Sequence, residues 1–315
     1  MTRETQRVGI TGATGFLGAV LLARLRERHR GTITALTRTI RSPQIDDAVN
    51  WLRGDLASPV DTDAFVRDLD VVVHLAGSSS PLTSNAHLQS DVLGNLLPTL
   101  SLIQAIRECG RPLHVVFASS GGAVYAAPPR RQAVAEDAPT APTSSYGIQK
   151  LASEEYFRMA SDHGWLTATV LRIGNPYGVL LPVERLQGFI GVAINRLAQG
   201  EPIRLFGDTH NVRDYVHLDD VTGLFERVLR PSEPFSIYNV GSGEGHSVDD
   251  ILSTIETIVG HTIPVERSAV AGEPRDLPPW IVLDAEKARR ELDWTPSVRL
   301  VEGLERLLTD AGVLV

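Results

Sequence analysis

The sequence of 315 residues predicts an α/β protein: a doubly wound parallel sheet with helices on both faces, and a smaller C-terminal α/β portion. Apolar, β-branched runs such as residues 70–75 are typical of parallel strands that are buried on both faces. Segments with apolar residues at helical intervals, the first over residues 16–25, alternate with these runs. A glycine-rich turn joins the first strand to the first helix, and the three features together indicate a Rossmann-type sheet.

The turn after the first strand carries glycines three residues apart, at Gly12, Gly15 and Gly18. Without side chains, the backbone can approach a pyrophosphate closely, and the first helical turn offers unpaired N–H groups at the positive end of the helix dipole. An ordinary tight turn is the alternative, but the position at the start of an α/β chain favours dinucleotide binding. The expected cofactor contacts here are Gly12, Gly15, Phe16, Leu17 and Gly18.

Composition limits the class of protein. Hydrophobic residues make up 43% of the chain, enough for one large domain or two closely joined ones. The net charge of −8 argues against nucleic acid as a partner. The single cysteine, Cys109, excludes an internal disulfide and offers no thiolate pair for a metal. No apolar run approaches the roughly 18 residues of a membrane span, and the polar residues 1–6 leave no room for a signal peptide. We expect a soluble cytoplasmic protein without membrane partner or metal.

The second strand, residues 33–36, leads to Arg38. In sheets of this type, a carboxylate at this place hydrogen-bonds the ribose 2′-hydroxyl of NAD, whereas an arginine pairs with the 2′-phosphate of NADP. Arg41 follows and no acidic residue occurs before Asp46. A solvated arginine at a strand end is the alternative, and the sequence favours NADP.

Residues 50–53 read as a weak third strand, followed by Asp55 and Leu56. A carboxylate at the carboxyl end of a strand can accept a hydrogen bond from the adenine amino group. Asp55 could instead cap a helix near residues 62–66. We assign Asp55 and Leu56 to the cofactor.

The strand at residues 70–75 ends in Leu75 and is followed by Ala76 and Gly77, small residues where a cofactor can lie against the backbone. These three residues are further expected cofactor contacts. His74 lies inside this strand, where a packed and hydrogen-bonded histidine is more common than a catalytic one, so we give it no role.

Residues 93–106 show helical spacing, which Pro98 is expected to break near its start. The next strand, residues 113–118, delivers Ser119 and Ser120 to the carboxyl edge of the sheet, where open α/β sheets bind ligands.

The following helix, for which residues 143–145 supply capping side chains, places Tyr146 and Lys150 one turn apart on one face. A free phenol has a pKa near ~10. A nearby ammonium and an oxidised nicotinamide would lower that pKa and let the tyrosine exchange a proton with a substrate oxygen during hydride transfer. Chance pairs with this spacing are common, but this one follows the fifth strand, where the reaction needs it.

After a sixth strand at residues 167–172, a break at residues 174–178 marks the expected hinge into a substrate-binding portion. We predict a nucleotide-binding domain at residues 1–172, to which residues 212–242 return, and a substrate-binding domain at residues 173–315. Further helices are expected at residues 187–199, 219–229, 248–259, 285–292 and 301–308, with strands at 203–205 and 237–240.

Arg213 and Arg275 each lie in a loop beside turn residues. Their guanidinium groups could clamp a diphosphate through bidentate hydrogen bonds, although surface ion pairs are the simpler reading of either residue alone.

Ten segments, in order, resemble the extended short-chain dehydrogenase/reductase family, and within it the nucleotide-sugar enzymes similar to UDP-glucose 4-epimerase. They are TGATGFLG (11–18), GDL (54–56), VVHLAG (72–77), SSGGAVY (119–125), YGIQK (146–150), LRIGNPYG (171–178), FGD (206–208), VRDYVHLDDV (212–221), YNVGSG (238–243) and LDWTPSV (292–298). The resemblance implies a Rossmann domain carrying NAD or NADP, a smaller domain holding a nucleoside-diphosphate sugar, and homodimers formed through two helices per subunit.

By the same resemblance, Tyr146 is the acid/base and Lys150 holds the nicotinamide ribose and tunes the tyrosine. Asn175, Arg213 and Arg275 match positions that contact the nucleotide diphosphate.

The chain departs from the family pattern in three ways. Gly121 occupies the place of the usual catalytic serine or threonine, so the sugar contact must come from Ser120, Ser119 or water, or is missing. We assign Ser120 to catalysis and substrate, and Ser119 to the cofactor. Gly122 and Ala123 replace the Asp-Glu pair of sugar 4,6-dehydratases. Arg38 stands where NAD-binding epimerases favour an acid.

The expected function is hydride transfer at C4 of a nucleotide-activated hexose. The motif set favours a 4-epimerase that recycles NAD. Arg38 and Gly121 favour the alternative, a 4-ketoreductase that uses NADPH on a 4-keto-6-deoxy sugar. A non-catalytic nucleotide sensor on the same scaffold is disfavoured by the intact Tyr146–Lys150 pair.

Overall fold

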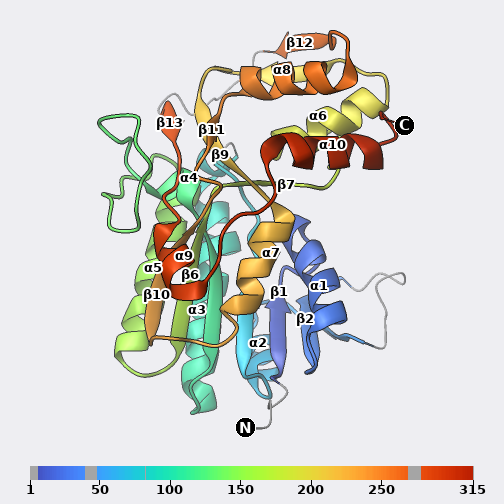
Figure 1. Cartoon of the computed structure of the whole chain (residues 1–315). Coiled ribbons are helices and arrows are strands. Elements are labelled where there is room, and N and C mark those ends of the chain that lie inside the picture. Colours follow the sequence, from blue (N-terminus) through green and yellow to red (C-terminus); the bar gives the residue numbers. More distant parts are fainter. Residues whose placement is uncertain (1–5, 40–47, 82, 269–277, 315) are drawn as a thin grey trace.

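A computed structural model describes residues 6–39, 48–81, 83–268 and 278–314 (Figure 1). Its largest element is a seven-stranded sheet of order β10-β6-β5-β4-β1-β2-β3, in which every neighbouring pair is parallel. The strands are β1 (Val8–Thr11), β2 (Ile33–Thr37), β3 (Asn50–Arg53), β4 (Val71–His74), β5 (His114–Ser120), β6 (Thr167–Ile173) and β10 (Phe235–Val240). The predicted doubly wound parallel sheet is confirmed.

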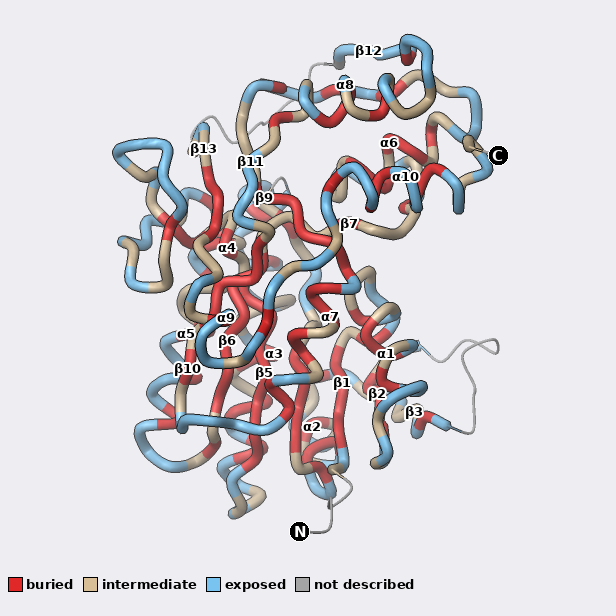
Figure 2. Tube along the Cα trace, viewed as in Figure 1, coloured by how far each residue is buried: buried red, intermediate tan, exposed pale blue. Residues whose placement is uncertain are grey.

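Helices cover both faces of this sheet, so the central strands β1 and β4 are buried along their whole length. Val73 and Val116 pack in the core that includes α1 and α7, whereas Val72 and Phe117 pack in the core that includes α3 and α5. Figure 2 shows the central strands buried between the two layers. The first layer holds α1 (Phe16–Arg28), α7 (Leu218–Arg227) and α9 (Glu286–Leu292), and the second holds α2 (Pro59–Val66), α3 (Leu88–Cys109) and α5 (Ser145–Asp162).

One local prediction is corrected and one alternative is excluded. Pro98 does not break its helix: α3 is continuous over 22 residues, and the short 3₁₀ helix η2 (Ser84–Ala86) precedes it. The proline ring forgoes one backbone hydrogen bond, but buried Leu102 and Ile106 hold the helix against the sheet, and tertiary packing outweighs propensity. Asp55 does not cap α2, because Ser58 is the N-cap and accepts from the Asp61 amide.

A smaller C-terminal lobe stands beyond the carboxyl ends of the strands (Figure 1). Its sheet joins β9 (Val212–His217) to β7 (Asn175–Tyr177), β11 (Gly245–His246) and β13 (Trp280–Ile281), and β8 (Ile203–Phe206) pairs with β12 (Val265–Ser268). The helices α6 (Phe189–Ala198), α8 (Val248–Val259) and α10 (Leu300–Asp310) enclose its core. The predicted helices agree with these to within three residues at each end.

The chain leaves the large sheet after β6, builds part of the lobe, and returns as α7 and β10, with β10 pairing beside β6. β9 belongs to the sheet of the lobe. Among the helices of the described ranges, none has the length and apolarity to cross a bilayer.

Candidate functional site

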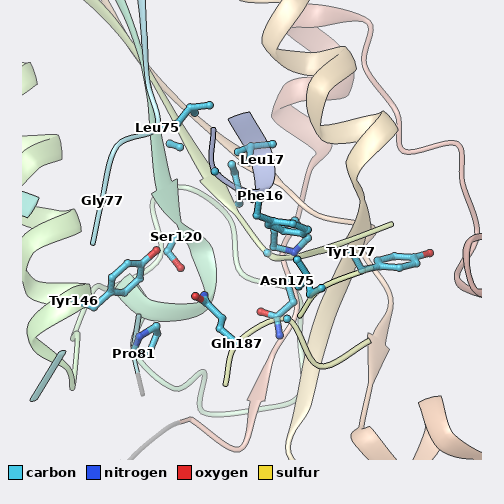
Figure 3. A pocket seen from close by; sticks show the side chains of 18 of the residues that line it. Phe16, Leu17, Leu75, Gly77, Pro81, Ser120, Tyr146, Asn175, Tyr177 and Gln187 are labelled. Carbon is cyan, nitrogen blue, oxygen red and sulfur yellow. The ribbon is translucent and has the colours of Figure 1, made fainter. Parts of the chain in front are cut away.

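A cavity of about 430 Å³ opens where the carboxyl ends of the parallel strands meet the C-terminal lobe. One wall comes from the β1–α1 turn, the ends of β4 and β5, and the start of α5 (Figure 3). The other wall comes from the β6–β7 junction, the loop before α6, and β9. The predicted site residues that line it are Gly12, Gly15, Phe16, Leu17, Gly18, Leu75, Gly77, Ser119, Ser120, Tyr146, Lys150, Asn175 and Arg213.

Two glycines of the β1–α1 turn, Gly12 and Gly18, are packed too closely to carry side chains. Gly12 has a φ of 72°, and a Cβ there would lie 2.8 Å from the Ala76 nitrogen. A Cβ on Gly18 would lie 2.1 Å from the Gly12 carbonyl oxygen. The Thr11 hydroxyl accepts from the amides of Leu75 and Ala76 at 3.2 Å and ties β1 to the end of β4. The helix α1 starts without a capping side chain, and its first turn lines the cavity. The backbone N–H groups of this turn can therefore donate to a ligand in the cavity.

Tyr146 and Lys150 project from the first two turns of α5, which begins at the N-cap Ser144. Lys150 Nζ donates to the Ala118 carbonyl at 2.6 Å and lies 5.6 Å from the centre of the Tyr146 ring. Burial lowers the pKa of Lys150 to about 8, and the Glu154 carboxylate opposes that shift.

Burial raises the pKa of Tyr146, and a hydrogen bond with Ser120 opposes the shift. The lowered pKa expected from the sequence is therefore wrong for the protein alone, because desolvation of the phenolate outweighs the neighbouring groups. The expectation from the sequence also counted the positive charge of an oxidised nicotinamide, which the protein alone does not have.

Of the hydroxyls that could replace the missing one at Gly121, the structure brings Ser120 to Tyr146. The two side chains point toward one another (Figure 3). The Ser119 side chain is buried and donates to Glu154, so its hydroxyl is engaged away from Tyr146. A Cβ on Gly121 would lie 2.6 Å from Leu283 Cδ1, which leaves no room for a serine in the present packing.

The opposite wall presents Asn175 and Arg213. The Asn175 side chain hydrogen-bonds the Tyr215 hydroxyl. Arg213 Nη1 donates to the Val212 carbonyl at 2.7 Å, and burial lowers the pKa of Arg213. No carboxylate pairs with this guanidinium in the described ranges, which leaves most of its donors for an anion.

Several predicted residues lie away from the cavity. Arg38 is exposed just past β2, and Asp55 is exposed with its carboxylate accepting from the Ala57 amide at 2.9 Å. Leu56 is buried in the core beneath α2, and Ala76 contacts Thr11 beside the cavity wall. Arg41, Asp46 and Arg275 fall outside the described residues.

The sequence interpretation missed the loop between β7 and α6, whose Leu181, Arg185 and Gln187 line the cavity. Arg185 lies over the Phe16 ring at 5.7 Å and so spans from the lobe to α1. The loop lacks periodicity, and its only signal is the pair of glycines that bracket it, Gly178 and Gly188, both with positive φ.

His74 is a core residue. Its ring nitrogens bond the hydroxyls of Thr11 at 2.8 Å and Thr99 at 3.1 Å, and burial lowers its pKa to about 3. Across the part of the chain that the structure describes, no three His, Cys, Asp or Glu side chains gather to hold a metal.

Comparison with known proteins agrees with this geometry. The model of the NAD dependent epimerase/dehydratase family matches residues 8–241. The dTDP-4-dehydro-6-deoxyglucose reductase of Escherichia coli is 28% identical over 325 residues, covering 98% of each chain. The UDP-glucose 4-epimerase of Mycolicibacterium smegmatis is 29% identical over 314 residues, covering 95% of this chain and 96% of the relative.

Among solved structures, the UDP-glucose 4-epimerase of Thermus thermophilus in complex with NAD has a TM-score of 0.87 at 30% identity, over 98% of this chain and 100% of the other. The family match and the end-to-end similarity together show that the chain is an enzyme of the NAD dependent epimerase/dehydratase family, as its ten motifs predicted.

Proposed function

We propose that the protein is a 4-epimerase of a nucleoside-diphosphate hexose that works by hydride transfer at C4, with Tyr146 as acid/base. The observation that carries the proposal is the cluster of Tyr146, Lys150 and Ser120 at one end of a cavity whose other wall presents Arg213. A single cavity can thus hold a reacting sugar at the tyrosine and its diphosphate at the arginine.

The β1–α1 turn fits a dinucleotide, because its glycines bring the backbone to the cavity surface and the first turn of α1 faces inward. When bound, a nicotinamide cofactor supplies the hydride acceptor and donor. The residues that would hold it are Gly12, Gly15, Phe16, Leu17, Gly18, Leu75, Ala76, Gly77 and Ser119, with Asp55 and Leu56 near the adenine.

In the proposed mechanism, the Tyr146 phenolate accepts the proton of the C4 hydroxyl as the C4 hydrogen leaves with its electron pair. The ammonium of Lys150, 5.6 Å from the ring, favours the phenolate. Ser120 hydrogen-bonds Tyr146 and aligns the phenol with the sugar oxygen. Return of the proton from Tyr146 to the 4-keto oxygen, once the sugar has turned its opposite face toward the cofactor, would give the epimer.

We propose that Arg213 and Asn175 hold the diphosphate, and that Arg275 joins them. Charge-assisted bonds from a guanidinium without a carboxylate partner suit two phosphate groups. A UDP- or dTDP-sugar is the substrate class, since the relatives named above act on these nucleotides.

A second candidate is an NADPH-dependent 4-ketoreductase of a 4-keto-6-deoxy sugar. Two observations support it: Arg38 is exposed just past β2, and the Escherichia coli reductase matches 98% of the chain. In sheets of this type, an arginine after the second strand can pair with the 2′-phosphate of NADP.

Denaturing the purified protein and identifying the released dinucleotide separates the two candidates. Stoichiometric NAD supports the epimerase. An empty protein that binds NADPH far more tightly than NADH, with the preference lost in Arg38→Ala, supports the reductase. Interconversion of UDP-glucose and UDP-galactose without added cofactor is the direct assay of the first candidate.

We further propose a homodimer through α3 and α5, which pack side by side. Their outward residues include Leu88, Leu93 and Ile148, which are 60%, 59% and 56% exposed. Such an apolar surface on two adjacent helices suits a second copy of the chain. Analytical ultracentrifugation of the protein and of Leu93→Glu tests this: the variant should sediment as a monomer.

A further inference from the structure

Three consecutive residues at the end of β5 hold three side chains from successive turns of α5. The Ala118 carbonyl accepts from Lys150 Nζ at 2.6 Å. Ser120 hydrogen-bonds Tyr146. Between them, the Ser119 hydroxyl donates to the Glu154 carboxylate, one turn beyond Lys150.

Glu154 is itself fixed by Arg172 on β6. Arg172 Nε lies 3.2 and 3.1 Å from the two carboxylate oxygens, and Nη2 lies 2.7 Å from Oε2. The side chains of Arg172 and Glu154 are only 5% and 1% exposed. Arg172 Nη1 donates onward to the Tyr125 hydroxyl and to the Glu136 carbonyl, both at 3.0 Å, so the cation is satisfied on each side.

A buried ion pair of this kind is weak evidence for stability, because desolvation of both charges offsets their attraction. Its geometry does have a second effect. The ion pair holds the Glu154 carboxylate where the Ser119 hydroxyl can donate to it. Ser119 lies between Ala118 and Ser120, the two residues that hold Lys150 and Tyr146.

We propose that Glu154 is a positioning residue for the Tyr146–Lys150 pair: by accepting from Ser119 it sets α5 against the end of β5 in the register that brings Lys150 to Ala118 and Tyr146 to Ser120. The inference rests on the proposed function, since it concerns how the acid/base pair is held. Glu154 itself is too deep to contact substrate.

Glu154 also sets the electrostatics at Lys150. The groups around the ammonium are Tyr146 and Glu154 on α5 and the neutral His74 on β4, with Arg172 on β6 beyond Glu154. Glu154 is the carboxylate that raises the pKa of Lys150 against the effect of burial. Loss of its charge would let Lys150 lose its proton at lower pH.

The test compares Ser119→Ala, which leaves the ion pair intact, with Glu154→Gln, which keeps an acceptor but removes the charge. Glu155→Gln is the matched control, because Glu155 is the next residue on α5 and is exposed in a pair with Arg158. Each variant is assayed for kcat, KM, cofactor affinity, melting temperature and pH profile with UDP-glucose as substrate.

Ser119→Ala should lower kcat about tenfold, as expected for loss of one hydrogen bond to a charged group, with KM for UDP-glucose unchanged. Glu154→Gln should shift the alkaline limb of the pH profile to lower pH. A second readout is the tyrosinate absorbance that Tyr146→Phe removes, whose titration should move in both variants and not in Glu155→Gln.

The inference is overturned if both variants only lower the melting temperature while kcat, pH profile and tyrosinate titration match the parent. If Glu154→Gln does not fold, Ser119→Ala alone decides. Tyr146→Phe separates the two levels of the argument: if it retains full turnover, the proposed function fails, whereas full activity of Ser119→Ala beside an inactive Tyr146→Phe overturns only the positioning role.

Discussion

The Lys150 ammonium lies 5.6 Å from the centre of the Tyr146 ring, one helical turn away, while its hydrogen bond to Ala118 holds it at the end of β5. The charge therefore faces the phenol without forming a direct bond to it. Each member of the pair has a separate anchor on the same strand, Ala118 for Lys150 and Ser120 for Tyr146.

Replacing Tyr146 by phenylalanine should reduce kcat by about 10²–10⁴, because general acid–base catalysis contributes that much and no other hydroxyl takes the place of the phenol. Cofactor affinity, followed by fluorescence titration, should stay within about twofold, since the ring is kept. Tyr156→Phe, on the same helix and 39% exposed, is the matched control and should be fully active. Equal kcat in both variants would remove Tyr146 from the mechanism.

Lys150 should make stability depend on pH. Its pKa of about 8 lies below the ordinary 10.5, so between these values the unfolded chain binds the proton and the folded chain does not. Stability therefore rises with pH in this window, by up to about 1.4 kcal/mol per pH unit. The stability of Lys150→Met should not rise in this window. Below pH 8, the difference in the free energy of unfolding between the parent and Lys150→Met should be constant.

Urea unfolding at several pH values between 7 and 10.5 measures this effect. Lys287→Met, on α9 away from the cavity, is the control for removal of a lysine. Parallel stability curves for the parent and Lys150→Met would show that Lys150 titrates normally in the folded protein.

Arg213→Ala should weaken UDP binding about 10- to 100-fold, because a charge-assisted bond to phosphate contributes about 1.5–3 kcal/mol. Arg213→Lys should recover only part of the affinity, since the ammonium cannot form two parallel bonds. Titration calorimetry with UDP measures both. Arg204→Ala, an exposed arginine of the lobe paired with Glu266, should bind UDP like the parent; an unchanged Arg213→Ala would place the diphosphate elsewhere.

Gly121→Ser, which restores the residue type expected at that position, should destabilise the protein by about 1–3 kcal/mol through overpacking. The cause is the 2.6 Å distance from the added Cβ to Leu283 Cδ1. Combining it with Leu283→Val should cost less than the sum of the two changes, a coupling that urea unfolding can measure. Strictly additive effects of the two changes on the free energy of unfolding would contradict contact between residues 121 and 283. Ser120→Ala is the comparison variant, and it should lower kcat without this loss of stability.

The strands and helices predicted best are those whose pattern of apolar and capping residues lies within one segment. The strands β1, β4 and β5 are short buried apolar runs, and α8 was predicted at its observed bounds because its caps, Ser247 and Gly260, flank a clear amphipathic pattern. Tyr146 and Lys150 lie on one helix, so their proximity follows from spacing alone.

Prediction was weakest for strands and side-chain contacts that depend on residues distant in the sequence. The strands β11 and β13 have two residues each and exist only because β9 pairs with both. The engagement of the Ser119 hydroxyl by Glu154, and hence the availability of Ser120, depends on how α5 packs on β5. Arg185 reaches Phe16 from a loop without periodicity.

The order of the large sheet makes the nucleotide-binding half inseparable from the rest. Its edge strand, β10, is synthesised only after the part of the lobe that runs from β7 to β9. A fragment ending at residue 172 would leave β6 paired with β5 alone and expose its other edge, which is apolar and ready to pair with other chains. During synthesis, this half cannot finish folding until residue 240 has left the ribosome, so truncation should yield aggregates rather than an independent dinucleotide-binding module.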